Sequence, residues 1–105
     1  MTHGFKAAAV ILLAALIATP AVAQSSADLY KTKCASCHGA DGLAATPMGK
    51  MMKVLSFKDP AMIKAGDAQF IASTTNGKGK MPAYKGKLTD QQIKDVIAFI
   101  RTLQK

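Results

Sequence analysis

Five consecutive residues, Cys34-Ala35-Ser36-Cys37-His38, constrain this chain more than any other part of its sequence. They form a C-x-x-C-H motif, which is the pattern of covalent haem attachment. Two thiols at this spacing can reach the two vinyl groups of one porphyrin, and the imidazole that follows can bind the iron as its proximal ligand. The motif therefore predicts one haem, bonded to Cys34 and Cys37 and ligated by His38.

The N-terminus has the features of a secretory signal peptide. A short segment with one lysine, Met1–Lys6, precedes an unbroken apolar run of 12 residues, Ala7–Ala18. Pro20 ends the run, and Ala21-Val22-Ala23 matches an A-x-A cleavage site. A membrane anchor is the alternative, but 12 apolar residues are too few to span a bilayer core of about 30 Å. We therefore expect residues 1–23 to be removed in export, which leaves a single domain at 24–105.

The two thiols have other interpretations, which the rest of the sequence weakens. A thioredoxin-like redox pair would need a βαβ pattern, and none is evident. A structural disulfide would leave His38 unexplained, and a closed zinc site needs four ligands where the motif supplies three. The chain has two cysteines, both in the motif, and its other histidine, His3, lies in the predicted signal. Bis-histidine ligation within residues 24–105 is therefore excluded by counting.

Residues 24–105 are basic, with 13 Lys and Arg against 6 Asp and Glu. The resulting net charge of +7 suits an acidic protein partner or peripheral contact with an anionic membrane surface. Nucleic acid is a poor candidate, because aromatic residues make up only 6% of the chain and no recognition motif is present.

Two helices are predicted upstream of an irregular loop. The first covers about Ala27–Lys33, behind the N-cap candidates Ser25-Ser26, and leads directly into the motif. The second covers about Asp67–Thr75, with Asp67 as its cap, and ends at Asn76-Gly77. The stretch 77–87 that follows contains three glycines and a proline, so no regular element is expected there.

The last helix has the strongest local signals. Thr89 and Gln92 form a capping box at its start. Its apolar residues recur on one face, as expected of an amphipathic helix packed on a core: Ile93, Val96, Ile97, Ile100 and Leu103. With no convincing alternating strand, residues 24–105 are predicted to be all-α.

Four apolar residues between the motif and Asp59-Pro60 also show helical spacing. Met48, Met51, Met52 and Leu55 recur at i, i+3, i+4 and i+7, which is one face of a short helix. We expect this face to pack in the core rather than to supply an iron ligand.

Met81 is the candidate for the distal iron ligand. It lies in the glycine-rich loop, and Pro82 disfavours helical geometry at the residue before it. An apolar side chain in a polar loop needs a buried destination, which the distal face of a haem would provide. Met62, beside Ile63, is expected in the core. Lys78 and Lys80 are alternative ligands, but a lysine would have to lose its proton and its hydration.

The chain resembles small bacterial class I cytochromes c over essentially all of residues 24–105. The helix leading into the haem motif and the capped C-terminal helix both match. The further matching stretches are Gly39-x-Asp41-Gly42, Asn76-Gly77 and Lys80-Met81-Pro82-Ala83-Tyr84.

This resemblance implies about four short helices wrapped around one covalently bound haem c, with the first and last helices crossing. It implies thioether bonds from Cys34 and Cys37, a proximal His38 and a distal Met81. Tyr30 matches the aromatic residue of the helix crossing and should face Phe99. A proline carbonyl commonly orients the proximal imidazole, and Pro47 is the candidate.

The function that the resemblance implies is that of a soluble, monomeric, periplasmic carrier of single electrons, and not of an enzyme. The alternatives are a haem subunit of a larger periplasmic dehydrogenase, and a haem enzyme or gas sensor with a labile distal ligand. Donor and acceptor would be redox proteins with acidic docking surfaces. They would meet the lysines that flank the motif and the methionine loop: Lys31, Lys33, Lys50, Lys53, Lys78, Lys80, Lys85 and Lys87.

Overall fold

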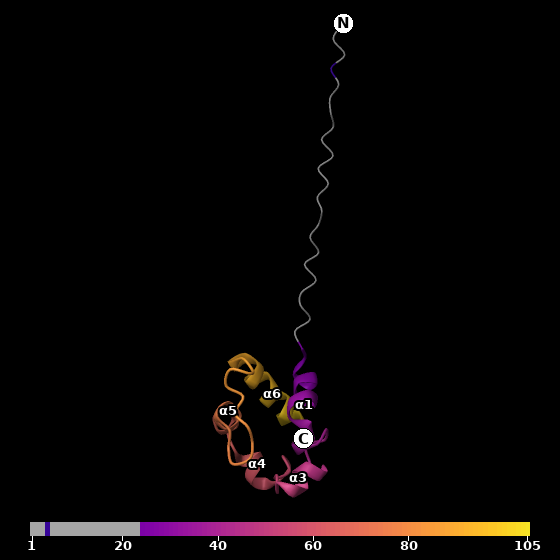
Figure 1. Ribbon diagram of the computed structural model, residues 1–105, viewed down its shortest axis with the longest axis vertical. Helices are drawn as coiled ribbons and strands as arrows, with labels where there is room; N and C mark the ends of the chain where they lie inside the picture. The colour runs from indigo at the N-terminus through magenta and orange to yellow at the C-terminus, as the bar shows by residue number, and fades with distance from the viewer. Residues whose placement is uncertain (1–3, 5–23) are drawn as a thin grey trace.

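The computed structural model describes Gly4 and residues 24–105, so all but one residue of the predicted signal lies outside the described part. The elements are α1 (Ser26–Lys33), α2 (Ala35–His38), α3 (Pro47–Met51), α4 (Pro60–Lys64), α5 (Asp67–Asn76) and α6 (Asp90–Leu103) (Figure 1). Over these residues, β structure is confined to two isolated bridges. None of the described helices is long and apolar enough to cross a membrane. The predicted all-α class is confirmed, with six helical segments instead of about four.

The local signals at the helix ends act as predicted at α1 and α6, but the prediction that Asp67 caps α5 is wrong. The Ser25 hydroxyl accepts a hydrogen bond from the Asp28 amide, so α1 begins at Ser26. The Thr89 hydroxyl accepts from the Gln92 amide at 3.1 Å, and the Gln92 side chain accepts from the Thr89 amide at 2.9 Å. This capping box starts α6. At α5 the N-cap is Gly66, one residue before the predicted Asp67.

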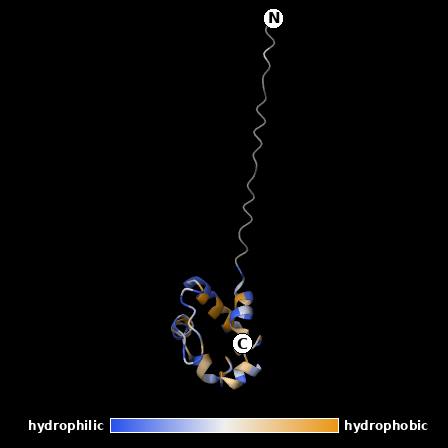
Figure 2. Cartoon of the chain, viewed as in Figure 1, coloured by the Kyte–Doolittle hydropathy of each residue, from blue (hydrophilic) through white to orange (hydrophobic). Residues whose placement is uncertain are grey.

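The core lies where α6 packs against α1 and α5. Figure 2 shows strongly hydrophobic residues along α6 beside α1, with hydrophilic residues at the start of α6. Its side chains Ile93, Val96 and Ile97 are at most 2% exposed. Tyr30 of α1 is also 2% exposed, and its ring centroid lies 5.2 Å from that of Phe99. The predicted contact between the first and last helices is therefore confirmed.

The Arg101 side chain links α6 to the beginning of α5. Its guanidinium forms an ion pair with Asp67 at 2.9 Å, donates to the Ala65 carbonyl oxygen and lies 4.3 Å from the centroid of the Phe70 ring. Because Phe70 is buried, the charged group also covers part of the apolar core.

The prediction that Met48, Met51, Met52 and Leu55 form one core-facing stripe is wrong. The helix ends at Met51, and Lys53 adopts a left-handed φ of +56°, which turns the chain out of helical geometry. The i+7 position therefore never reaches the same face as the first. Met48, Met51 and Leu55 are 41%, 71% and 52% exposed, and Met52 is half-buried.

Gly49 lets α3 approach the backbone of α2 closely. A Cβ at this position would overlap the Cys37 carbonyl oxygen and would lie 2.6 Å from the Ala44 carbonyl oxygen. The Thr46 hydroxyl reinforces the contact, since it donates to the Ser36 carbonyl at 2.8 Å and accepts from the Gly49 amide at 2.9 Å. This packing fixes the outer side of the segment that carries Cys37.

Replacing Gly49 with alanine should therefore destabilise the haem-bearing protein. Overpacking of this kind costs about 1–3 kcal/mol, and rigid backbone oxygens on both sides place Gly49→Ala in the upper part of that range. Chemical denaturation of the purified holoprotein measures the effect. Gly66→Ser is the matched control, because a Cβ at Gly66 meets nothing within 4 Å and serine is a good N-cap for α5. Equal losses in the two variants would contradict the close-packing account.

Candidate haem-binding cavity

A cavity of about 570 Å³ opens inside the helical shell. This volume lies within the usual range for small-molecule and cofactor sites, about 300–1,000 Å³. Much of its wall is apolar, with contributions from Phe57, Phe70 and the α6 residues Val96, Ile97 and Ile100. The lining also contains five sulfur atoms and one imidazole, from Cys34, Cys37, His38, Met52, Met62 and Met81.

Cys34 stands at the junction of α1 and α2, Cys37 lies within α2, and neither cysteine forms a disulfide. Cys34 caps α2, and Cys37 follows one turn later, so both side chains reach the same cavity. Burial, with a smaller contribution from Cys37, raises the pKa of the Cys34 thiol to about 11. Burial of this side chain therefore disfavours the charged thiolate form.

His38 is the last residue of α2, and burial lowers the pKa of its imidazole. The neutral form therefore prevails at physiological pH, and it is the form that binds metals. The ring stacks on Phe57, with 4.6 Å between centroids and 14° between planes. Its Nδ1 atom is buried and has no hydrogen-bond partner among the described residues.

The hydrogen bond predicted between His38 and the Pro47 carbonyl is therefore not formed. Pro47 is the first residue of α3, where a carbonyl points along the helix toward the following turn. The imidazole is positioned instead by the face of the Phe57 ring. Two hydrogen bonds hold Phe57 in turn. Its backbone amide donates to the Gly42 carbonyl oxygen at 2.9 Å, and the Gln104 side chain donates to the Phe57 carbonyl oxygen at 3.0 Å.

Met81 lies in the segment between α5 and α6, where it closes a tight turn whose tip is Gly79-Lys80. Its amide donates to the Lys78 carbonyl at 2.9 Å, and the Lys78 amide donates back to the Met81 carbonyl at 3.1 Å. Gly77 has a φ of +77°, and a Cβ there would lie 2.9 Å from the Met81 carbonyl oxygen. The glycine-rich sequence thus allows the turn that presents the Met81 side chain at the cavity wall.

All four residues predicted to hold a haem line this one cavity, although they come from segments more than 40 residues apart. Two thiols that form no disulfide, a neutral imidazole with a buried nitrogen that has no partner among the described residues, and a partly buried thioether meet apolar walls there. Thiols can form thioether bonds, and imidazole and thioether are both haem-iron ligands. The residues present therefore fit a covalently attached haem.

Several other lining residues have no clear signal in the sequence. Phe57 is not part of any motif, and its contact with His38 joins residues 19 positions apart. Helical spacing places Met52 in a core stripe, yet it lines the cavity. The one sequence signal for the region of Met52 and Phe57 is the spacing of apolar residues before Asp59-Pro60.

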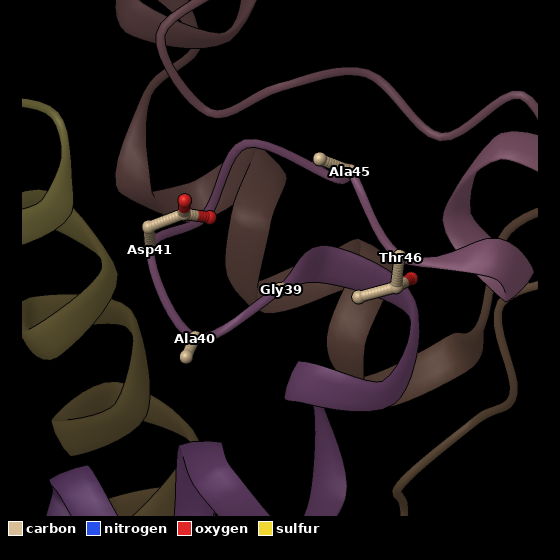
Figure 3. A pocket seen from close by; sticks show the side chains of 5 residues that line it. All are labelled: Gly39, Ala40, Asp41, Ala45 and Thr46. Atoms are coloured by element: carbon tan, nitrogen blue, oxygen red, sulfur yellow. The ribbon is translucent and has the colours of Figure 1, made fainter.

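A second, smaller hollow of about 280 Å³ lies beside the turn after α2, between Gly39-Ala40-Asp41 and Ala45-Thr46 (Figure 3). It has no sulfur or imidazole in its lining. The Asp41 carboxylate accepts a hydrogen bond from the Leu43 amide at 3.0 Å, which stabilises the turn itself. We therefore assign this hollow to turn geometry and not to a second ligand site.

The chain is similar to known c-type cytochromes, which agrees with a cavity lined for haem. The family model described as cytochrome c oxidase, cbb3-type, subunit III matches residues 21–100. The chain is 39% identical to cytochrome c6 of Nostoc sp. over 78% of its own length and 74% of that protein. It is 32% identical to cytochrome c6 of Leptolyngbya boryana over 74% and 88% of the two chains.

Two further comparisons extend these matches. The chain is 33% identical to the cbb3-type cytochrome c oxidase subunit FixP of Azorhizobium caulinodans, over 81% of its own length but only 28% of that protein. A solved structure, the KustC0563 c-type cytochrome, superposes with a TM-score of 0.71 at 29% identity and covers 77% of this chain and 99% of that one. The chain therefore belongs to the c-type cytochromes, as a small class I monohaem member.

Proposed function

We propose that this protein is a soluble carrier of single electrons between redox proteins, with one covalently bound haem c. The observation that carries the proposal is the convergence of Cys34, Cys37, His38 and Met81 on one cavity. The two thiols would bond the porphyrin, His38 would be the proximal ligand and Met81 the distal ligand. The haem, when bound, supplies the one-electron redox chemistry of its iron.

The chain's own residues have three tasks in this proposal. The thiols would hold the haem covalently, the neutral imidazole and the thioether would bind its iron, and the apolar walls would exclude water. With an imidazole and a thioether both bound to the iron, little room would remain for a substrate, which favours a carrier over an enzyme. A thioether ligand also raises the reduction potential relative to a harder ligand.

Three methionines line the cavity, and they differ in the local structure that carries them. Met62 belongs to α4 and packs against the core cluster, and Met52 directly follows α3. Met81 stands in an irregular segment whose backbone is fixed by the paired bonds with Lys78. Pro82 keeps Met81 out of helical geometry, so its side chain is the one that the local structure is built to present.

The relatives support a small carrier over a part of a larger complex. The matched region covers 74% and 88% of two cytochromes c6, but only 28% of FixP. We also propose that residues 1–23 are a signal peptide that is removed on export to the periplasm, where the domain 24–105 acts as a monomer.

The charge around the cavity supports docking to acidic partners. Lys33, Lys53, Lys78 and Lys80 all line the cavity and are exposed. In the described part of the chain, no Asp or Glu contributes to that lining. A partner that approaches the cavity mouth therefore meets charge of one sign, which steers an acidic surface toward the haem.

Met81→Ala tests the ligand assignment. The holoprotein should lose the weak far-red absorption band that thioether-ligated ferric haem shows, and its reduction potential should fall. Added cyanide should then bind ferric protein at once. Met52→Leu and Met62→Leu are matched controls, since both residues line the same cavity. The assignment fails if the band survives in Met81→Ala or disappears in either control.

Docking by charge predicts a strong dependence on salt. The rate of electron transfer to an acidic redox partner should fall at least tenfold between low and high ionic strength, because screening shortens the Debye length from about 10 Å at 0.1 M to about 3 Å at 1 M. Stopped-flow kinetics measures this rate. Lys80→Gln should reduce both the rate and its salt dependence, whereas Lys94→Gln, an exposed position on α6 outside the cavity lining, should change neither. A rate that is independent of salt would exclude steering.

A further inference from the structure

The segment Gly77–Leu88, which carries Met81, is held at both of its ends. Gly77 caps α5, and the Tyr84 and Lys85 amides donate to the Thr74 and Thr75 carbonyls of α5 at 2.9 and 3.1 Å. The Lys87 and Leu88 amides then both donate to the Tyr84 carbonyl. Tyr84 is thus the point where the segment turns back toward α6.

The Tyr84 side chain makes one contact that the local backbone bonds do not explain. Its hydroxyl donates to the Lys33 carbonyl oxygen at 2.8 Å, across 51 residues of sequence. Lys33 is the last residue of α1 and directly precedes Cys34. Among the hydrogen bonds of the described residues, this is the one that joins the Met81 segment to α1.

The position of this bond relates it to both sides of the cavity. Tyr84 is half-buried, and Lys33, Cys34, Met81 and Tyr84 all contribute to the cavity lining. One end of the bond is adjacent to a haem-attachment cysteine, and the other end is three residues from the candidate distal ligand. Loss of the bond would leave the Met81 segment attached to α5 and α6 but free to move away from the attachment motif.

We propose that Tyr84 is a positioning residue that holds the Met81 segment against the haem-attachment motif and so favours the thioether as the distal ligand. The inference rests on the proposed function, which assigns Met81 to the iron. Tyr84 acts through the backbone of Lys33 and needs no contact with the iron. Because Lys78 and Lys80 share the Met81 turn, a released segment would also bring amines into competition with the thioether.

Tyr84→Phe tests the inference, since it removes one hydroxyl and keeps the ring. Titration of the ferric holoprotein with imidazole measures how readily the distal ligand is displaced, with the far-red band as the readout. A single net hydrogen bond predicts that the apparent imidazole affinity rises by about threefold to tenfold in the variant. Hydrogen exchange at the Tyr84 and Lys85 amides should accelerate as well, because their bonds to α5 lose the support of the side chain.

Tyr30→Phe is the matched control. It removes the chain's other tyrosine hydroxyl, which donates to the Gly39 carbonyl at 2.5 Å and does not touch the Met81 segment. We expect this variant to lose stability without a rise in imidazole affinity. If Tyr84→Phe leaves the affinity unchanged, or if Tyr30→Phe raises it equally, Tyr84 has no specific positioning role. A wild-type protein without the far-red band would instead overturn the Met81 assignment, and this inference with it.

Discussion

The hydrophobic core of this protein borders a cavity of about 570 Å³, and α2, α4, α5 and α6 all contribute side chains to its lining. The contact of α6 with α1 and α5 builds the wall behind the cavity, and α2 brings two thiols and an imidazole to its edge. So small a domain has a marginal core unaided. A covalently held porphyrin would complete that core, so cofactor binding and folding depend on the same surfaces.

Two sets of packing contacts hold the attachment motif in place. On its outer side, Gly49 and Thr46 pack α3 onto the backbone at Cys37. On its inner side, Phe57 stacks on the His38 ring and also packs tilted against Tyr30 and Phe70, with centroids 6.5 and 6.2 Å apart. Aromatic packing thus links the imidazole to the contact between α1 and α6. The geometry of the candidate ligand therefore depends on the global fold and not only on the motif.

The features that could be predicted from the sequence are those determined by residues close together in the chain. The capping box at Thr89 defined α6, and the C-x-x-C-H spacing identified the cavity's thiols and imidazole, because each signal lies within a few residues. Prediction failed where the chain leaves its periodic geometry: Lys53, with positive φ, breaks the methionine stripe. It also failed where contacts join distant segments. Neither the stacking of Phe57 on His38 nor the bond from Tyr84 to Lys33 has a signature in the order of residues.

The fold and the proposed function both depend on one haem bonded to Cys34 and Cys37. Mass spectrometry of the exported, denatured protein tests this attachment most directly, since only covalent attachment survives denaturation. The account predicts the mass of residues 24–105 increased by one haem, with the added mass confined to the peptide that contains both cysteines. A haem-bearing protein that releases its haem on denaturation, with both thiols free or joined in a disulfide, would contradict it.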